Sequence, residues 1–511
     1  MKRIISLLFF STCLVTTIRA QLPEDALRTA WFTQNGTARM VAIGGTMGSL
    51  GGDLSANHVN PAGLGLYRTR EVILTPGMGL NNTRFSFRGS DTSNNRNAFE
   101  YGTIGAVWGK NKRDGYSRYN SSAFAISVTQ LANYQNRESF RGFNNFSSFT
   151  EQYLEELIRD RADTNAALSN YIFGSSLAFR TFLIDTTSGP GGTVSGYQSL
   201  VPISTGVNQF FDAVTRGSYN EIAIGTAGNV EDRLYVGASF TLPIIRYSRE
   251  FNYTERDATN NPNNQFSFFE YRELYSSNGF GIGAKLGMIY KPAGMWRLGF
   301  ALHTPQMIGF RDQIRSSITA NTESYAGLRT ETSDQLNSGN AGMREYTMIT
   351  PWRAIASISH VFREINDTRL QRAFITADLE FVNYRGARFI GGEFVSSQED
   401  AYYRFLNETI RDIYRGNINA RVGGEIKFNT FMLRMGGAYY GSPYNNDFKA
   451  GRTVASGGIG YRNKGIFIDL TYSHTFNRDV RFPYLLNDKP NTFAEQTGSI
   501  GRLLATIGFK F

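Results

Sequence analysis

Apolar and polar residues alternate along most of this chain, and the alternation continues to its last residue. In the final segment, one face carries Leu503, Ala505, Ile507, Phe509 and Phe511, opposite Arg502, Thr506 and Lys510. A period of two predicts β-strands, and the same period recurs near 232–251, 278–291 and 295–311. A soluble sandwich does not place bulky apolar residues on the outer face of strand after strand. The pattern therefore indicates a β-barrel in a membrane.

The alternation predicts an antiparallel barrel of about fourteen strands over residues 71–511. The expected strands lie near 71–88, 99–109, 121–133, 218–228, 232–251, 278–291, 295–311, 344–361, 372–388, 415–428, 430–441, 452–462, 466–476 and 500–511. Connections after even-numbered strands are mostly tight, as at 229–231. Those after odd-numbered strands are mostly long, at 134–217, 252–277, 312–343, 389–414 and 477–499. Long loops are expected outside the cell, which places both termini on the periplasmic side.

Residues 1–20 predict a cleaved secretory signal peptide, with Lys2 and Arg3 before an apolar stretch and a cut before Gln21. No later stretch is long and apolar enough for a membrane helix. The single cysteine, Cys13, lies in the signal, so the mature chain has neither disulfides nor cysteine chemistry. Acylation of Cys13, as in a lipoprotein, is the alternative, but 10–12 match a lipobox poorly.

The formal net charge is +10, but no run of five basic residues occurs. We interpret this charge as a solvated lumen and loops that contact anionic lipopolysaccharide, and we expect no nucleic-acid partner. The terminal phenylalanine, with apolar residues at alternate positions before it, resembles the signal that the barrel-assembly machinery recognises. We therefore expect a multi-pass barrel in the cell outer membrane.

Residues 21–70 do not show the strand pattern. The segment is rich in glycine, including Gly44, Gly45 and Gly48, and continues to Asn60-Pro61-Ala62-Gly63, where proline fixes a turn. A barrel of fourteen strands would be an open hole without a plug, so this segment is expected to be a hatch at the periplasmic side or in the lumen. Small residues and one rigid turn fit a plug that moves, and they fit a static seal equally well.

Several segments together resemble the FadL family of outer-membrane transporters of hydrophobic compounds. They are the hatch run 40–66 with its Asn-Pro-Ala signature, and the pieces at 217–221, 232–237, 285–292, 298–305, 434–437 and 442–444. The resemblance covers nearly the whole mature chain and implies a fourteen-stranded barrel with a hatch. It also implies passive uptake of a hydrophobic ligand, such as a long-chain fatty acid, that leaves sideways through the wall. The loop at 134–217 is longer than such transport requires, so a role in protein secretion or loop-mediated protein interaction is the alternative.

Basic residues at expected lumen positions are the remaining candidates for a site: Lys285, Arg297, Arg434 and Arg502. They could contact a carboxylate head group, or pair with lumen acids such as Asp378, Glu380 and Glu425. Helical patterns at 150–162 and 401–414 predict loop helices, which either pack over the barrel mouth or bind a ligand or partner.

The sequence gives no sign of an enzyme. The four histidines, at 58, 303, 360 and 474, form no pair at metal-ligand spacing, and no nucleophile elbow is present. His58, beside the hatch turn, is either a haem ligand or, more simply, a member of a hydrogen-bond network. We therefore expect no catalytic residues, metal or cofactor.

Overall fold

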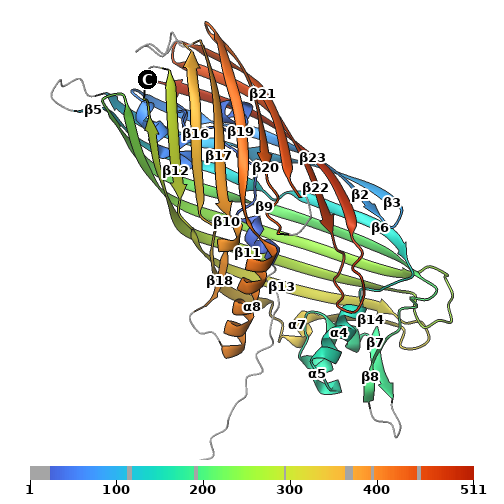
Figure 1. Cartoon of the computed structure of the whole chain (residues 1–511). Coiled ribbons are helices and arrows are strands. Elements are labelled where there is room, and N and C mark those ends of the chain that lie inside the picture. The colour runs from blue at the N-terminus through green and yellow to red at the C-terminus, as the bar shows by residue number, and fades with distance from the viewer. Residues whose placement is uncertain are drawn as a thin grey trace, which may run out of the picture.

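The computed structural model describes residues 23–111, 118–188, 194–292, 295–362, 372–392, 396–445 and 450–511, so the predicted signal peptide and Cys13 lie outside the described residues. The wall is a closed antiparallel barrel of fourteen strands (Figure 1). In order round the barrel these are β1 (Arg70–Leu74) with β2 (Pro76–Phe87), β3 (Ser90–Tyr101) with β4 (Thr103–Asn111), β5 (Tyr119–Asn133) with β6 (Asn136–Asn144), β9 (Val207–Val230), β10 (Leu234–Asp257), β11 (Phe268–Tyr290), β12 (Trp296–His303) with β13 (Met307–Asn321), β15 (Gly342–Ile349) with β16 (Arg353–Phe362), β17 (Ala373–Asn383) with β18 (Arg388–Gly391), β19 (Gly416–Phe428), β20 (Phe431–Tyr440), β21 (Arg452–Asn463), β22 (Ile466–Arg481) and β23 (Ala494–Lys510). The predicted fold class and strand number are confirmed.

The other elements lie at the long-loop end of the barrel or inside it. At the long-loop end, Figure 1 shows α4 (Glu151–Arg159), α5 (Thr164–Ser169), α7 (Ser333–Leu336), α8 (Ser397–Ile413), the hairpin β7 (Ile184–Ser188) with β8 (Val194–Ser199), and β14 (Leu328–Thr332). The short helix α6 (Ser175–Arg180) belongs to the connection that holds α4 and α5, whereas the 3₁₀ turn η4 (Tyr384–Gly386) interrupts the wall strand between β17 and β18. Among the described residues, no helix has the length and apolar character needed to cross a membrane.

The polarity of the wall reverses along single strands. In β10 the even-numbered residues face outward, and they are apolar from Leu234 to Ile244 but polar from Arg246 onward. The inward face changes in the opposite sense, from Ser239 and Thr241 to the half-buried Tyr247 and the buried Phe251 and Tyr253. An outward apolar stretch of roughly ten residues is what a membrane-spanning β-strand needs. We call the zone of outward apolar residues the apolar band.

The wall extends beyond the apolar band as a barrel of soluble type. In β11 the outward face is apolar from Phe280 to Tyr290 and mainly polar from 270 to 278. This extension explains why the strands are longer, and the loops shorter, than the alternation predicted. The structure has strands at 136–144 and from 207 onward, both inside the predicted loop 134–217. Above the band, apolar residues face the interior instead of the outside. A prediction that assumes outward apolar residues therefore places the strand ends too early.

Residues 23–66 lie inside the barrel. They form α1 (Pro23–Arg28), α2 (Ala38–Ala42), α3 (Ala56–Val59) and the 3₁₀ helix η1 (Pro61–Leu66). The α2 helix packs against β20 to β23, whereas η1 packs against β4, β5 and β9 to β11, on other parts of the wall. Because the segment contacts strands round most of the barrel, it fills the lumen at the level of the apolar band.

The last strand closes the barrel. β23 pairs with β22 on one side and with β1 and β2 on the other, and the backbone groups of Arg70 and Phe511 bond each other at 3.0 and 3.1 Å. Closed barrels resist detergent unfolding because they have no free edge. We therefore predict that the unboiled protein migrates faster than the boiled protein on denaturing gels, and that a chain lacking 494–511 gives no such shift. Recovery of the native chain as a soluble periplasmic protein would contradict this prediction.

Candidate functional site

Asn60 fastens the hatch turn to the wall. Its side-chain amide donates to Gly48 O at 2.5 Å and lies 3.2 and 3.3 Å from Met288 O and Phe300 O, while its carbonyl oxygen accepts from Ala62 N. Pro61 follows as the first residue of η1, where its missing N–H costs nothing. One buried side chain thus links two parts of the hatch to β11 and β12.

Glycines in the wall bring the hatch backbone into direct contact with the strands. A Cβ at any of eight wall positions would lie under 3.0 Å from a hatch atom: Gly102, Gly225, Gly237, Gly287, Gly299, Gly423, Gly436 and Gly458. At Gly299 that hatch atom is Gly48 O, at 2.1 Å, and at Gly287 it is Asn60 Oδ1, at 1.9 Å. The wall is therefore shaped for a docked hatch.

The predicted hatch glycines lie in the same contact zone. Gly44 and Gly45 have φ of 73° and 80°, which favours glycine over any residue with a side chain. A Cβ at Gly48 would lie 2.5 Å from Ser357 Cβ, and one at Gly63 would lie 2.7 Å from Leu50 O. These glycines make close packing contacts with the wall and within the hatch.

The lumen below the long-loop end is charged, and the predicted basic residues Lys285, Arg434 and Arg502 pair with acids. Arg434 is fully buried and lies 2.6 Å from both Glu425 and Asp469. Lys285 pairs with Glu221 and Arg502 with Glu100. Arg297 is also buried, at 5% exposure. Of these acids, only Glu425 was among those named from the sequence.

His58 belongs to a hydrogen-bond network. Its Nδ1 lies 2.9 Å from Glu221 and its Nε2 lies 3.0 Å from Ser127 Oγ. Among the described residues, no group of three or more His, Cys, Asp or Glu side chains is arranged to hold a metal ion. Both ring nitrogens of His58 are therefore engaged by protein side chains.

The ladder between the second and third wall strands stops part-way up. Below, β4 pairs with β5, but above, within the described part of the chain, β3 pairs only with β2 and β6 only with β9. Side chains bridge the two strands instead: Asn94 donates to Ser139 O at 2.8 Å, and Arg96 to Gln135 at 2.9 Å. We call this stretch between β3 and β6 the seam; Figure 1 shows the two strands close together along one side.

The seam begins at the upper part of the apolar band. Phe99, at its lower end, is 72% exposed and lies opposite Met78, an outward apolar residue of β2. Above Leu80, the outward residues of β2 become polar. The lower end of the seam therefore faces lipid tails, at the edge of the head-group region.

The hatch is attached where the seam begins. The Asn35 side-chain amide donates to Tyr101 O at 2.9 Å on one side of the seam and to Gln130 O at 2.7 Å on the other. Gly36 O accepts from Thr103 N at 3.2 Å. Hatch groups thus provide hydrogen bonds at the point where the wall ladder ends.

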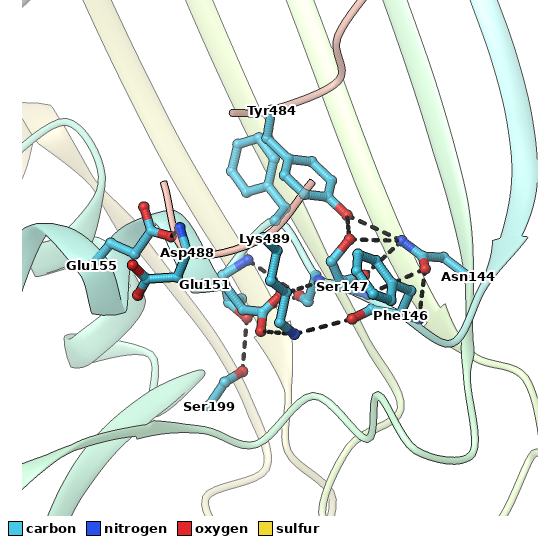
Figure 2. A network of polar contacts seen from close by, with 12 residues as sticks. Asn144, Phe146, Ser147, Glu151, Glu155, Ser199, Tyr484, Asp488 and Lys489 are labelled. Carbon is cyan, nitrogen blue, oxygen red and sulfur yellow. Dashed lines mark hydrogen bonds and ion pairs between the residues drawn. The ribbon is translucent and has the colours of Figure 1, made fainter. Parts of the chain in front are cut away.

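At the long-loop end, a polar network joins the segment between β6 and α4, the helix α4 and the loop after β22 (Figure 2); we call these segments the cap, and Tyr484 takes part in the network. Its hydroxyl lies 2.8 Å from Ser147 Oγ, 3.0 Å from the Asn144 amide and 3.1 Å from the Gln209 amide. These contacts join the loop that follows β22 to the segment between β6 and α4.

Charged side chains fasten the same loop to α4. Lys489 lies 2.6 Å from Glu151 and donates to Phe146 O at 3.0 Å, and Glu155 accepts from the backbone N–H groups of Asn487 and Asp488 (Figure 2). Most of these contacts are exposed or half-buried, so each is worth roughly 1 kcal/mol or less. The cap is therefore held by many weak contacts.

A buried carboxylate lies beneath the cap. Glu255 accepts from Ser148, Phe149 N, Gln209 and Tyr253, within a cluster of buried aromatic side chains. Burial raises the pKa of Glu255 above its ordinary value, and the four hydrogen bonds oppose that rise only in part. Ionised Glu255 therefore costs folding free energy at neutral pH.

A pH dependence of the cap follows from Glu255. Because its pKa is higher in the folded state, its contribution to stability is largest below the ordinary carboxyl value and is lost as pH rises through the folded pKa. We predict that amide exchange in 144–150, corrected for intrinsic rates, becomes slower as pH falls from 8 towards 5. Glu255→Gln should remove this dependence, whereas Glu250→Gln, on the same strand but outward, should retain it. Equal pH dependence in the wild type and Glu255→Gln would contradict the assignment.

Sequence reasoning identified the hatch turn but not Asn35, Glu221 or Glu255. Asn35 is one of many asparagines and acts through carbonyls 66 and 95 residues away. Glu221 and Glu255 had a detectable signal, because each is an acid on the inward face of a predicted or extended strand.

Comparisons with protein-family models and with curated protein sequences gave no match. Solved structures do match. The Pseudomonas putida toluene transporter TodX has a TM-score of 0.53 at 14% identity, over 94% of this chain and 99% of its own. A Pseudomonas aeruginosa FadL homologue has a TM-score of 0.53 at 15% identity, over 93% and 98%. The CymD monoaromatic hydrocarbon channel has a TM-score of 0.50 at 13% identity, over 94% and 98%. The chain therefore has the fold of the FadL-type transporters of hydrophobic compounds, as the sequence resemblance predicted.

Proposed function

We propose that this protein is an outer-membrane channel for passive uptake of hydrophobic small molecules, such as long-chain fatty acids, which leave sideways through the seam. The observation that carries the proposal is the seam itself, an interrupted ladder that begins in the apolar band and is attached to the hatch. The long-loop end faces the outside of the cell and both termini lie at the periplasmic end, because long loops mark the outer side of such barrels.

The polarity of the interior supports a sideways path. Beneath the cap, the inward side chains form an aromatic and aliphatic cluster that includes Phe149, Phe251 and Phe269. Lower in the lumen, buried ion pairs such as Arg421 with Glu380 and Arg434 with Glu425 face the hatch. An apolar molecule gains nothing by displacing water or protein from paired charges. It is therefore expected to pass from this apolar cluster through the seam into lipid.

The paired basic residues serve the channel as a barrier. Lys285, Arg434 and Arg502 hold carboxylates of the wall, and Lys285 also donates to His58 O of the hatch at 2.9 Å. They favour the docked hatch. They also make a path straight down the lumen unfavourable for an apolar solute, which cannot replace the partners of these charges. Gly44, Gly45, Gly48 and the Asn60–Gly63 turn would then gate the seam, because their displacement moves Asn35.

Cross-linking the seam tests the exit. The mature chain expected from the signal peptide has no cysteine, so Asn94→Cys with Ser139→Cys introduces a single thiol pair across the seam. A short bifunctional thiol reagent should reduce uptake of labelled oleate or toluene by cells at least fivefold. The matched control is Asn252→Cys with Arg272→Cys, a register pair on hydrogen-bonded β10 and β11, which should leave uptake unchanged.

Unchanged uptake after complete cross-linking of the seam would reject the sideways exit. A gene deletion separates the remaining alternatives. Loss of uptake supports the channel, whereas normal uptake with failed secretion of a cargo protein supports a secretion or docking role for the long loops.

A further inference from the structure

Two arginines lie on the outer surface of the wall, just above the apolar band. On β10 the last outward apolar residue is Ile244, and Arg246 follows at the next outward position. Arg216 on the neighbouring β9 is opposite Ser248, one outward position higher. With strands about 4.8 Å apart and outward positions about 6.7 Å apart, their Cα atoms are about 8 Å from each other.

Further positive charge surrounds this pair. Arg96 and Arg137 lie beside Arg216. Burial lowers the pKa of Arg96, and repulsion from Arg216 and Arg137 lowers it further. Arg137 pairs with Asp212, whereas in the described part of the chain Arg216 and Arg246 have neither an ion pair nor a hydrogen bond from their side chains. Four guanidinium groups therefore lie near one another, and one of them, that of Arg137, is paired with a carboxylate.

The surface beside the arginines is hollowed. A depression of about 230 Å³ is lined by residues that include the outward Arg216, Ser248, Glu250, Leu274, Ser276 and Arg315, and Glu250 is paired with Arg272. The hollow forms because Ser248 and Ser276 are small and lie opposite each other on β10 and β11. Arg315 is held by Asp334, so Arg216 supplies the free charge at the rim.

We propose that this depression, with Arg216 and Arg246, binds the phosphate of a lipid A-type glycolipid in the outer leaflet. Planar guanidinium groups match phosphate oxygens in charge and geometry. The height fits a head group, because the outward residues directly below, Ile244 and Phe280, are apolar and can pack against acyl chains. The outward position excludes a solute in the lumen. This inference rests on the proposed placement of the long-loop end outside the cell, but not on the transport activity.

The experiment uses the full chain in detergent and measures bound lipid A by native mass spectrometry. The probes are lipid A with two phosphates and the same lipid with both phosphates removed. The test variant is Arg216→Gln with Arg246→Gln. The control is Arg141→Gln with Arg256→Gln, exposed outward arginines on β6 and β10 that lie further from the membrane.

The test variant should bind phosphorylated lipid A about tenfold more weakly, since each exposed ion pair is worth up to about fivefold. The control variant should bind like the wild type, and the dephosphorylated lipid should bind all three proteins equally weakly. Equal loss in test and control variants, or equal binding of both lipids to the wild type, would overturn the proposal. Oleate uptake should be unchanged in the test variant, so this result is independent of the channel assay.

Discussion

Arg434→Met is expected to lower the free energy of unfolding by about 3–5 kcal/mol, because it removes the cation that two buried acids share. The Arg434 side chain is fully buried between Glu425 of β19 and Asp469 of β22, each of which lies 2.6 Å away. Glu425 keeps a second partner, Arg39 of the hatch, at 3.2 Å. Asp469 is buried, at 1% exposure, so in the variant its charge costs more folding free energy than that of Glu425. The measurement is the urea midpoint of the gel-shifted form in lipid.

A matched control separates lost charge from lost side-chain volume. Arg256→Met changes the same residue type on the exposed outer face of β10. It should change the free energy of unfolding by less than about 0.5 kcal/mol. The triple change Arg434→Met, Glu425→Gln and Asp469→Asn removes all three charges and should recover much of the loss. If Arg434→Met is as stable as the control, the buried ion pairs do not stabilise this wall.

Strand period and order could be predicted from the sequence because alternation is a local property. The final strand was expected at 500–511, and the structure places β23 at Ala494–Lys510. The earlier start lies above the apolar band, where Ala494 and Gln496 face inward and Glu495 faces outward. Local patterns cannot show where the solvent changes from lipid to water along one strand, and so the strand ends were misplaced.

The candidate site could be predicted only where chemistry is encoded in consecutive residues. The Asn60-Pro61 turn was such a motif, and its amide proved to join two hatch segments to the wall. The seam was not predictable, because both of its segments lie largely outside the predicted strands: β3 is polar at every position before Ala98, and β6 lies within the predicted loop 134–217. Ion-pair choice was equally hidden, since Lys285 meets Glu221 only through the register of β9 to β11.

Gly299→Val is expected to undock part of the hatch while the barrel still assembles. A Cβ at this position would lie 2.1 Å from Gly48 O and 2.8 Å from Ser49 Cα, so backbone atoms of the hatch must move. Overpacking of this kind costs about 1–3 kcal/mol, which shifts the docked population by about five- to more than a hundredfold. The wall can accept valine because β12 keeps its ladders with β11 and β16.

The expected readout is permeability. Cells with Gly299→Val should become sensitive to large polar antibiotics, and the purified protein should conduct ions in planar bilayers, while the heat-dependent gel shift persists. Gly309→Val is the matched control: this β13 glycine faces outward, and the nearest atom to its Cβ is 3.9 Å away. Asn60→Ala with Pro61→Ala loosens the same contact without overpacking, so it tests the hatch even if Gly299→Val fails to assemble. If either hatch variant assembles and neither conducts ions nor alters oleate uptake, the hatch is a static seal, and its link to the seam through Asn35 has no part in transport.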